Sequence, residues 1–146
     1  NGNATFAVSA AGMVTRSVVA TEQDNTVVNV NNPTLKIEKL SDTAEGGTPG
    51  IFRITRSGNM GSAVWVYFGY SGSALNGSDY SLSGNGIASN FIIMSAGSAY
   101  ADITVLPKAD QQTEVPETLT VTLTANALYN LDAAKYSATM TITDRV

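Results

Sequence analysis

The chain has 146 residues, 43% of them hydrophobic, a net charge of −4, and neither cysteine nor histidine. The length fits one domain of roughly 100–150 residues with some extra sequence, and the acidic balance, with no basic stripe, excludes a nucleic-acid partner. Without cysteine or histidine there are no disulfides, no thiolate or imidazole metal ligands and no Ser-His-Asp triad. Any metal must therefore be bound by oxygen atoms, which favours hard cations such as Ca²⁺.

The N-terminal extension, residues 1–33, contains short apolar runs that are typical of strands: Phe6–Val8, Val14–Val19 and Val27–Val30. Two interpretations stay open: strands added to the following domain, or the junction with a preceding module ending at Asn31-Asn32-Pro33. The apolar runs predict that the extension packs on the domain. No stretch approaches the ~18 apolar residues of a membrane span, and no signal peptide is visible, so we expect the sequence to be part of a larger protein.

Residues 34–146 are dominated by alternation of apolar and polar residues, the period of half-buried strands. Val64, Val66 and Phe68 alternate with Trp65 and Tyr67, and Gly- and Asn-rich turns separate the alternating runs. The pattern predicts an immunoglobulin-like, seven-stranded antiparallel β-sandwich, and residues 126–135 are interpreted as a long loop. The seven predicted strands are Thr34–Leu40, Gly50–Thr55, Ala63–Tyr70, Asn90–Met94, Ala99–Leu106, Glu117–Thr124 and Lys135–Thr143.

Acidic residues gather at one predicted end of this sandwich. If the strands alternate in direction, six carboxylates from four separate segments meet there, whereas the other end offers Asp132 alone. Such a cluster repels itself, and a divalent cation relieves the repulsion, because Ca²⁺ accepts six to eight oxygen ligands in flexible geometry. Solvated acidic loops are the alternative interpretation. The six residues are Glu45, Asp79, Asp110, Glu114, Glu117 and Asp144.

Several segments, taken in order, resemble the Calx-beta family, which occurs in sodium–calcium exchangers and in many bacterial surface and secreted proteins. The resemblance covers about residues 34–146 and implies the sandwich fold and a calcium site. Its segments are Ala44–Gly47, Gly50–Gly58, Leu75–Tyr80, Ala101–Val105, Asp110–Glu114, Glu117–Leu123 and Ala138–Asp144.

The resemblance also implies which residues bind calcium. The family often has paired Asp where this chain has Ala109-Asp110, and consecutive Asp where it has Asp144-Arg145. These departures imply one or two weak sites rather than a multi-ion cluster, and a degenerate, metal-free structural repeat is an alternative. The family's calcium ligands fall on Glu45, Asp79, Asp110, Glu114 and Asp144.

The predicted function is a calcium-binding module of a larger bacterial cell-surface or secreted protein, acting in adhesion or as a calcium-rigidified spacer. Its expected partners are neighbouring domains of the same polypeptide and a cell-surface protein or polysaccharide, and its expected location is extracellular. Catalysis is not expected, because carboxylates on an exposed sandwich end lack a deep cleft. A rival function is a carbohydrate-binding module that uses Trp65 and Tyr67, which lie on the outer side of their strand.

Overall fold

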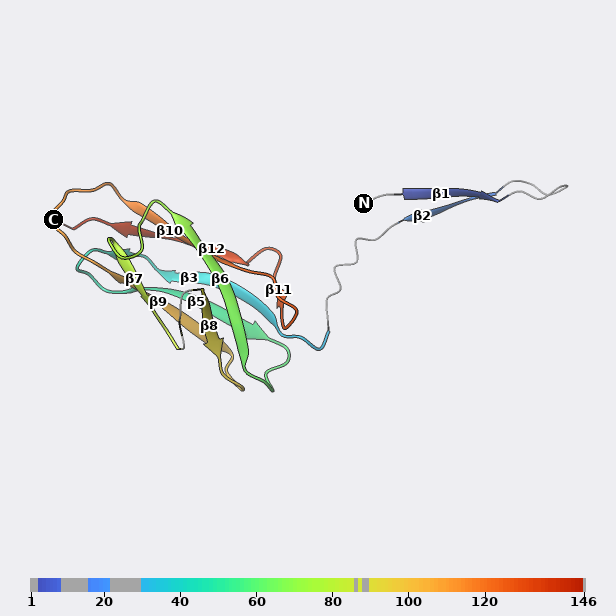
Figure 1. Ribbon diagram of the computed structural model, residues 1–146, viewed down its shortest axis with the longest axis horizontal. Coiled ribbons are helices and arrows are strands. Elements are labelled where there is room, and N and C mark those ends of the chain that lie inside the picture. Colours follow the sequence, from blue (N-terminus) through green and yellow to red (C-terminus); the bar gives the residue numbers. More distant parts are fainter. Residues whose placement is uncertain (1–2, 9–15, 22–29, 86, 88–89, 146) are drawn as a thin grey trace.

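A computed structural model describes residues 3–8, 16–21, 30–85, 87 and 90–145. Strands β1 (Asn3–Val8) and β2 (Arg16–Thr21) pair with each other, antiparallel, in a two-stranded sheet of their own (Figure 1). The run Val27–Val30 lies outside the described residues except for Val30. The division of the chain at residue 33, and the packing of residues 1–33 on the domain, stay predictions.

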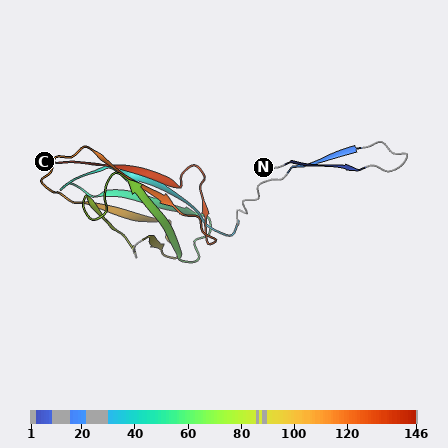
Figure 2. The same ribbon diagram turned by 45° about the horizontal axis from the view of Figure 1, so that its top comes forward.

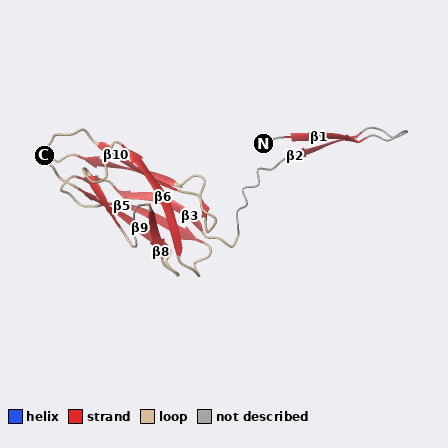
Figure 3. Cartoon of the chain, viewed as in Figure 1, coloured by secondary structure: helices blue, strands red, loops and turns tan. Residues whose placement is uncertain are grey.

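The other strands form two five-stranded sheets packed as layers of a sandwich (Figures 1 and 2). One sheet has the order β4-β12-β10-β6-β8, and the other has the order β11-β3-β5-β9-β7. Strands and loops account for the whole described chain (Figure 3), and no helix in it is long and apolar enough to cross a membrane. The strands are β3 (Thr34–Ser41), β4 (Thr43–Ala44), β5 (Gly50–Ser57), β6 (Val64–Gly72), β7 (Tyr80–Ser83), β8 (Phe91–Met94), β9 (Tyr100–Pro107), β10 (Glu117–Leu123), β11 (Asn130–Leu131) and β12 (Ser137–Thr143).

The all-β sandwich fold is confirmed, and each of the seven predicted strands is present within about two residues of its predicted bounds. Sequence reasoning missed β4, β7 and β11, and β11 lies inside the segment that was interpreted as a loop. Strands β4 and β11 have two residues each and pair in parallel, β4 with β12 and β11 with β3. Two residues are too few to show a period of two, so these pairings left no pattern in the sequence.

The core lies between the sheets and is built from the apolar side of each alternating strand. Phe52, Ile103 and Val121 are fully buried, while the Thr residues between the apolar positions of β10 face outward. Burying each large apolar side chain contributes about 1.5–3 kcal/mol. The sandwich therefore has a core that does not depend on a metal.

The loops at one end of the sandwich, together with the residues that follow β12, form what we call the acidic end: residues 42–49, 73–79, 108–116 and 144–145. Backbone hydrogen bonds tie these segments together, from Lys108 N to Asp79 O at 2.8 Å and from Glu45 N to Thr143 O at 2.9 Å. The opposite end includes residues 58–63 and 95–99, where Gly97 N donates to Met60 O at 2.8 Å. We call it the arginine end, after the buried Arg56.

Candidate metal centre

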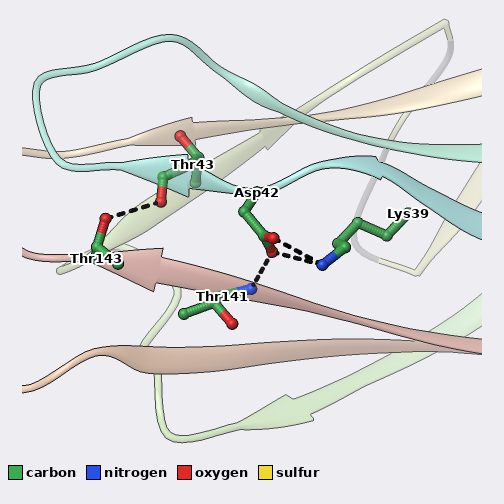
Figure 4. Close-up of polar contacts among 5 residues, drawn as sticks. All are labelled: Lys39, Asp42, Thr43, Thr141 and Thr143. Atoms are coloured by element: carbon green, nitrogen blue, oxygen red, sulfur yellow. Dashed lines mark hydrogen bonds and ion pairs between the residues drawn. The ribbon is translucent and has the colours of Figure 1, made fainter.

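A turn fastened to strand β12 leads the chain into the acidic end (Figure 4). Asp42 accepts a hydrogen bond from Thr141 N at 2.7 Å and pairs with Lys39 Nζ, also at 2.7 Å. The hydrogen bond from Lys39 is the main reason that the pKa of Asp42 lies below its usual value. Asp42 is thus neutralised by the chain itself, and the turn delivers β4 and then Glu45 to the edge of the core.

Glu45 is buried with an exposed fraction of 4%, and its Oε2 atom has no hydrogen-bond partner. Its backbone is held by the bond to Thr143 and by the following turn, in which Gly46 has a φ of +57°. A buried carboxylate oxygen without a partner costs several kcal/mol unless a cation or a proton compensates it. Glu45 therefore fits a cation-binding end better than it fits a solvated loop.

The side chains of Asp79, Glu114 and Glu117 offer carboxylate oxygens that all lie within 4.8 Å of one another. They come from the β6–β7 loop, the β9–β10 loop and the first residue of β10. Two oxygens that bind one Ca²⁺ at about 2.3–2.6 Å can be at most about 5 Å apart. This group, which we call the carboxylate triad, therefore has the donor type and the spacing that a calcium ion requires.

The β6–β7 loop holds Asp79 in place. Asp79 Oδ2 accepts a hydrogen bond from Leu75 N at 2.5 Å, and Asp79 N donates to Leu75 O at 3.0 Å. The turn passes through Gly77, whose φ of +99° is a conformation that other residues rarely adopt. The fully buried Tyr80 follows directly and anchors the loop in the core.

Glu117 occupies a position that belongs to the core side of β10. It has the same parity as the buried Leu119 and Val121, and its own exposure is intermediate. Burial, a hydrogen bond to Asp79 and repulsion from the neighbouring carboxylates raise the pKa of Glu117 to about 7. Without a cation, this raised pKa favours a proton on Glu117, which lies in hydrogen-bonding contact with Asp79.

The pKa of Glu114 is raised by burial and by carboxylates from every segment of the acidic end. Burial raises its pKa first, followed by repulsion from Asp110, Asp79, Glu45 and Asp144 in that order. The structure thus brings all five sequence-predicted ligands into one electrostatic neighbourhood. Of these five, the carboxylate triad contains Asp79 and Glu114, and the ligand role of the full set stays a prediction.

Asp110 and Asp144 each accept a hydrogen bond from a backbone amide of the β9–β10 loop. Asp110 Oδ1 accepts from Gln112 N at 2.6 Å, and Asp144 Oδ2 accepts from Glu114 N at 2.8 Å. Each carboxylate retains further lone pairs, since an ionised Asp can accept about four hydrogen bonds. Both residues therefore shape the loop that carries Glu114, and both keep acceptor capacity for a cation.

Glu117 was counted in the acidic cluster but is absent from the ligand set that the family resemblance implied. The signal that identifies it is the strand alternation, because Glu117, Leu119, Val121 and Leu123 fall on one side of β10. A carboxylate at an inward-facing position is unusual without a partner. The two aromatic candidates, Trp65 and Tyr67, lie on the outer side of β6, as predicted, with exposed fractions of 49% and 37%.

Comparison with known proteins gives structural relatives only, since no family model and no curated protein sequence matches the chain. The chain is similar to the apo form of the Calx CBD1 domain, with a TM-score of 0.61 and 16% identity over 79% of this chain and 99% of that one. It is also similar to CBD12 of CALX1.2 (TM-score 0.58, 16% identity, 76% of this chain and 45% of that one). A third similar structure is the calcium binding domain CBD12 of CALX1.1 (TM-score 0.58, 17% identity, 75% and 44%).

The fold of this chain is therefore that of the Calx calcium-binding domains, as the sequence resemblance implied. The chain spans less than half the length of the two CBD12 structures that it matches. At these identities the likeness concerns the fold, and the chemistry of this chain depends on the residues of its own acidic end.

Proposed function

We propose that this chain is a calcium-binding β-sandwich module of a larger bacterial cell-surface or secreted protein. The observation that carries the proposal is the carboxylate triad, with its oxygens within 4.8 Å of one another, beside a buried Glu45 Oε2 that has no partner. An all-oxygen donor set suits Ca²⁺, which tolerates irregular geometry, better than Mg²⁺, which demands a near-ideal octahedron and keeps its waters. The fold shared with the Calx calcium-binding domains supports the same ligand.

The module has a structural rather than a catalytic role in this proposal. Bound Ca²⁺ would join the β3–β5, β6–β7 and β9–β10 loops and the chain after β12, which are the segments that carry the acidic residues. A cation that neutralises these carboxylates rigidifies the end from which the chain leaves the sandwich. The module would then fix its orientation toward a neighbouring domain, in an adhesin or as a spacer.

Calorimetric titration of the chain with Ca²⁺ tests the proposal. We expect a dissociation constant of about 10⁻⁴–10⁻³ M, the range of extracellular modules, because the site is small and partly open. Glu117→Gln should weaken binding at least tenfold, because it removes a charged ligand from the carboxylate triad, whereas Asp132→Ala at the arginine end should bind like the wild type. Absence of heat with Ca²⁺ up to 10 mM, roughly tenfold above that range, would leave only a metal-free structural sandwich.

A further inference from the structure

The two outer faces of the sandwich differ in chemistry. The face of the β11-β3-β5-β9-β7 sheet carries charged residues, among them Lys36, Arg53 and Asp102. The face of the β4-β12-β10-β6-β8 sheet, which we call the neutral face, presents no charged side chain from the described residues of β6, β8, β10 and β12. Its outward residues are Trp65, Tyr67, Gly69, Ser71, Phe91, Ile93, Thr118, Thr120, Thr122, Ser137, Thr139 and Thr141.

An aromatic platform occupies the part of the neutral face formed by β6 and β8. The Trp65 ring stacks on Phe91, with centroids 5.1 Å apart and planes 14° apart, and Tyr67 leans against Phe91 at 6.0 Å. Cross-strand pairing of Tyr67 with Phe91 fixes the rings in register. Even so, Trp65 stays 49% exposed, so a broad and pre-positioned apolar surface faces outward.

Beside the platform, Gly69 leaves a gap in the row of outward side chains of β6, which we call the trough. Gly69 faces outward within β6, and a Cβ atom placed on it would meet no atom within 4 Å. Glycine weakens a strand interior and often marks a place where a ligand approaches the backbone closely. A shallow hollow adjoins the platform and is lined by Tyr67, Phe68, Asn90, Thr124, Ala125 and Asn126.

Hydroxyl groups border the other side of the trough. Gly69 pairs in register with Thr122, whose Oγ1 bonds Ser137 Oγ at 2.9 Å, and the next row joins Thr120 to Thr139 at 2.8 Å. Each of these hydroxyls keeps acceptor capacity for an outside partner. The buried Tyr129 hydroxyl fixes the floor beneath, donating to Thr124 O at 2.6 Å and accepting from Tyr67 N at 3.2 Å.

We propose that the neutral face binds an uncharged polysaccharide chain. The C–H face of a sugar ring is apolar and stacks on an aromatic ring, whereas its rim of hydroxyls needs donors and acceptors. The neutral face offers both on neighbouring strands: rings from Trp65 and Tyr67 on β6, and hydroxyls from the threonine rows of β10 and β12. The absence of charge disfavours a nucleic acid or an acidic polymer, which would need cations opposite its own charges. The site is separate from the carboxylate triad and does not depend on it.

Titration of the full chain with cellohexaose, mannohexaose and xylohexaose tests this proposal. Trp65 is the only tryptophan in the sequence, so its emission reports directly on the platform. We expect saturable binding of at least one of the three sugars, equally in Ca²⁺ and in chelator. By calorimetry, Trp65→Ala should weaken binding at least tenfold. Tyr100→Ala is the matched control, because Tyr100 is an aromatic residue 54% exposed on the other sheet, and it should bind like the wild type.

Gly69→Val separates a binding role from a structural one. Valine fills the trough and favours the strand, so sugar binding should fall at least tenfold while the urea midpoint stays equal or rises. The proposal is overturned if no sugar binds, if Trp65→Ala and Tyr100→Ala bind alike, or if binding needs Ca²⁺. Shielding of Trp65 from acrylamide in the free chain would overturn it too, as would a dimer that Gly69→Val dissociates, because the face would then already be covered by protein.

Discussion

The two ends of the sandwich deal with buried charge in opposite ways. At the arginine end, Arg56 is 2% exposed, and its Nε and Nη2 atoms donate to Asn59 O at 2.9 and 2.7 Å. Nη2 also reaches Ser62 O at 2.8 Å, which leaves Nη1 as the nitrogen without a partner. At the acidic end, carboxylates face other carboxylates. At the arginine end, backbone carbonyls of the chain therefore accept from two of the three guanidinium nitrogens, whereas the acidic end gathers carboxylates whose repulsion the proposed Ca²⁺ would relieve.

The largest expected effect comes from breaking the arginine end. Arg56→Met keeps most of the apolar stem but removes the charged donors that hold residues 58–63. Hydrogen bonds to charged groups contribute about 1.5–3 kcal/mol each, so we expect the free energy of unfolding to fall by about 3 kcal/mol. Urea unfolding should show the same loss in Ca²⁺ and in chelator.

Arg53→Met is the control for this substitution. Arg53 makes a surface pair with Asp102 at 2.7 Å and lies 4.0 Å from the Tyr100 ring centroid, with its side chain 33% exposed. Surface pairs contribute about 1 kcal/mol or less. If Arg56→Met were no more destabilising than Arg53→Met, the bonds at the arginine end would not be stabilising the loop.

The acidic end should respond to metal by a comparable amount. In the proposed site Ca²⁺ should bind only the folded chain, because the ligands come from segments that the unfolded chain does not hold together. At a hundredfold excess over the dissociation constant this adds about 2.7 kcal/mol, or a rise of about 10 °C in melting temperature for a domain of this size. Thermal unfolding followed by circular dichroism measures the rise.

Asp79→Asn and Glu117→Gln should each abolish most of that rise, because each removes a charge from the carboxylate triad. Asparagine also keeps the acceptor that Leu75 N needs, so the loop should persist. In chelator both variants should melt at or above the wild-type temperature, since one repelling charge is gone. A full calcium response in both variants would place the ion elsewhere.

The sequence predicted the long strands and the gathering of acidic residues well, because both follow from alternation repeated over many positions. It could not predict β4, whose two residues pair with β12 only after the Asp42 turn brings them there. The burial of Glu45 depends on that pairing, so the sequence could not predict it either. The alternation of β10 places Glu117 on the core side and could have identified it, but the ligand set implied by the family resemblance does not contain this residue.

The pH dependence of stability should show a smaller effect at the acidic end. The pKa of Glu117 is about 7 in the folded chain, against an ordinary value of 4.5 for a glutamate. A raised pKa means that the folded state holds the proton more tightly, so this contribution is full below pH 4.5 and is lost as the pH rises to about 7. In chelator, the urea midpoint of the wild type should therefore fall over that window relative to Glu117→Gln.

The calcium response should grow over the same pH window, because the ion must displace the proton from the carboxylate triad. Solvent screens a partly exposed group, so the pH effect in chelator should stay below the calcium effect. Parallel pH profiles for the wild type and Glu117→Gln would show that folding does not raise the pKa of Glu117.

The smallest expected effect is that of Asp132→Ala, which tests whether the calcium response is local. Asp132 lies in the turn after β11, where its Oδ1 accepts from Ala134 N at 2.9 Å, and losing such a local acceptor costs roughly 0.5–1 kcal/mol. The variant should melt slightly lower in chelator, yet gain as many degrees from Ca²⁺ as the wild type.

Calcium could also stabilise an acidic chain merely by screening its net charge of −4. In that case Asp132→Ala and Glu117→Gln, compared above pH 7 where each variant removes one negative charge, would lose the same part of the response. A site at the acidic end predicts instead that only Glu117→Gln loses it, so the difference between these two variants decides whether the two ends of the sandwich differ in function.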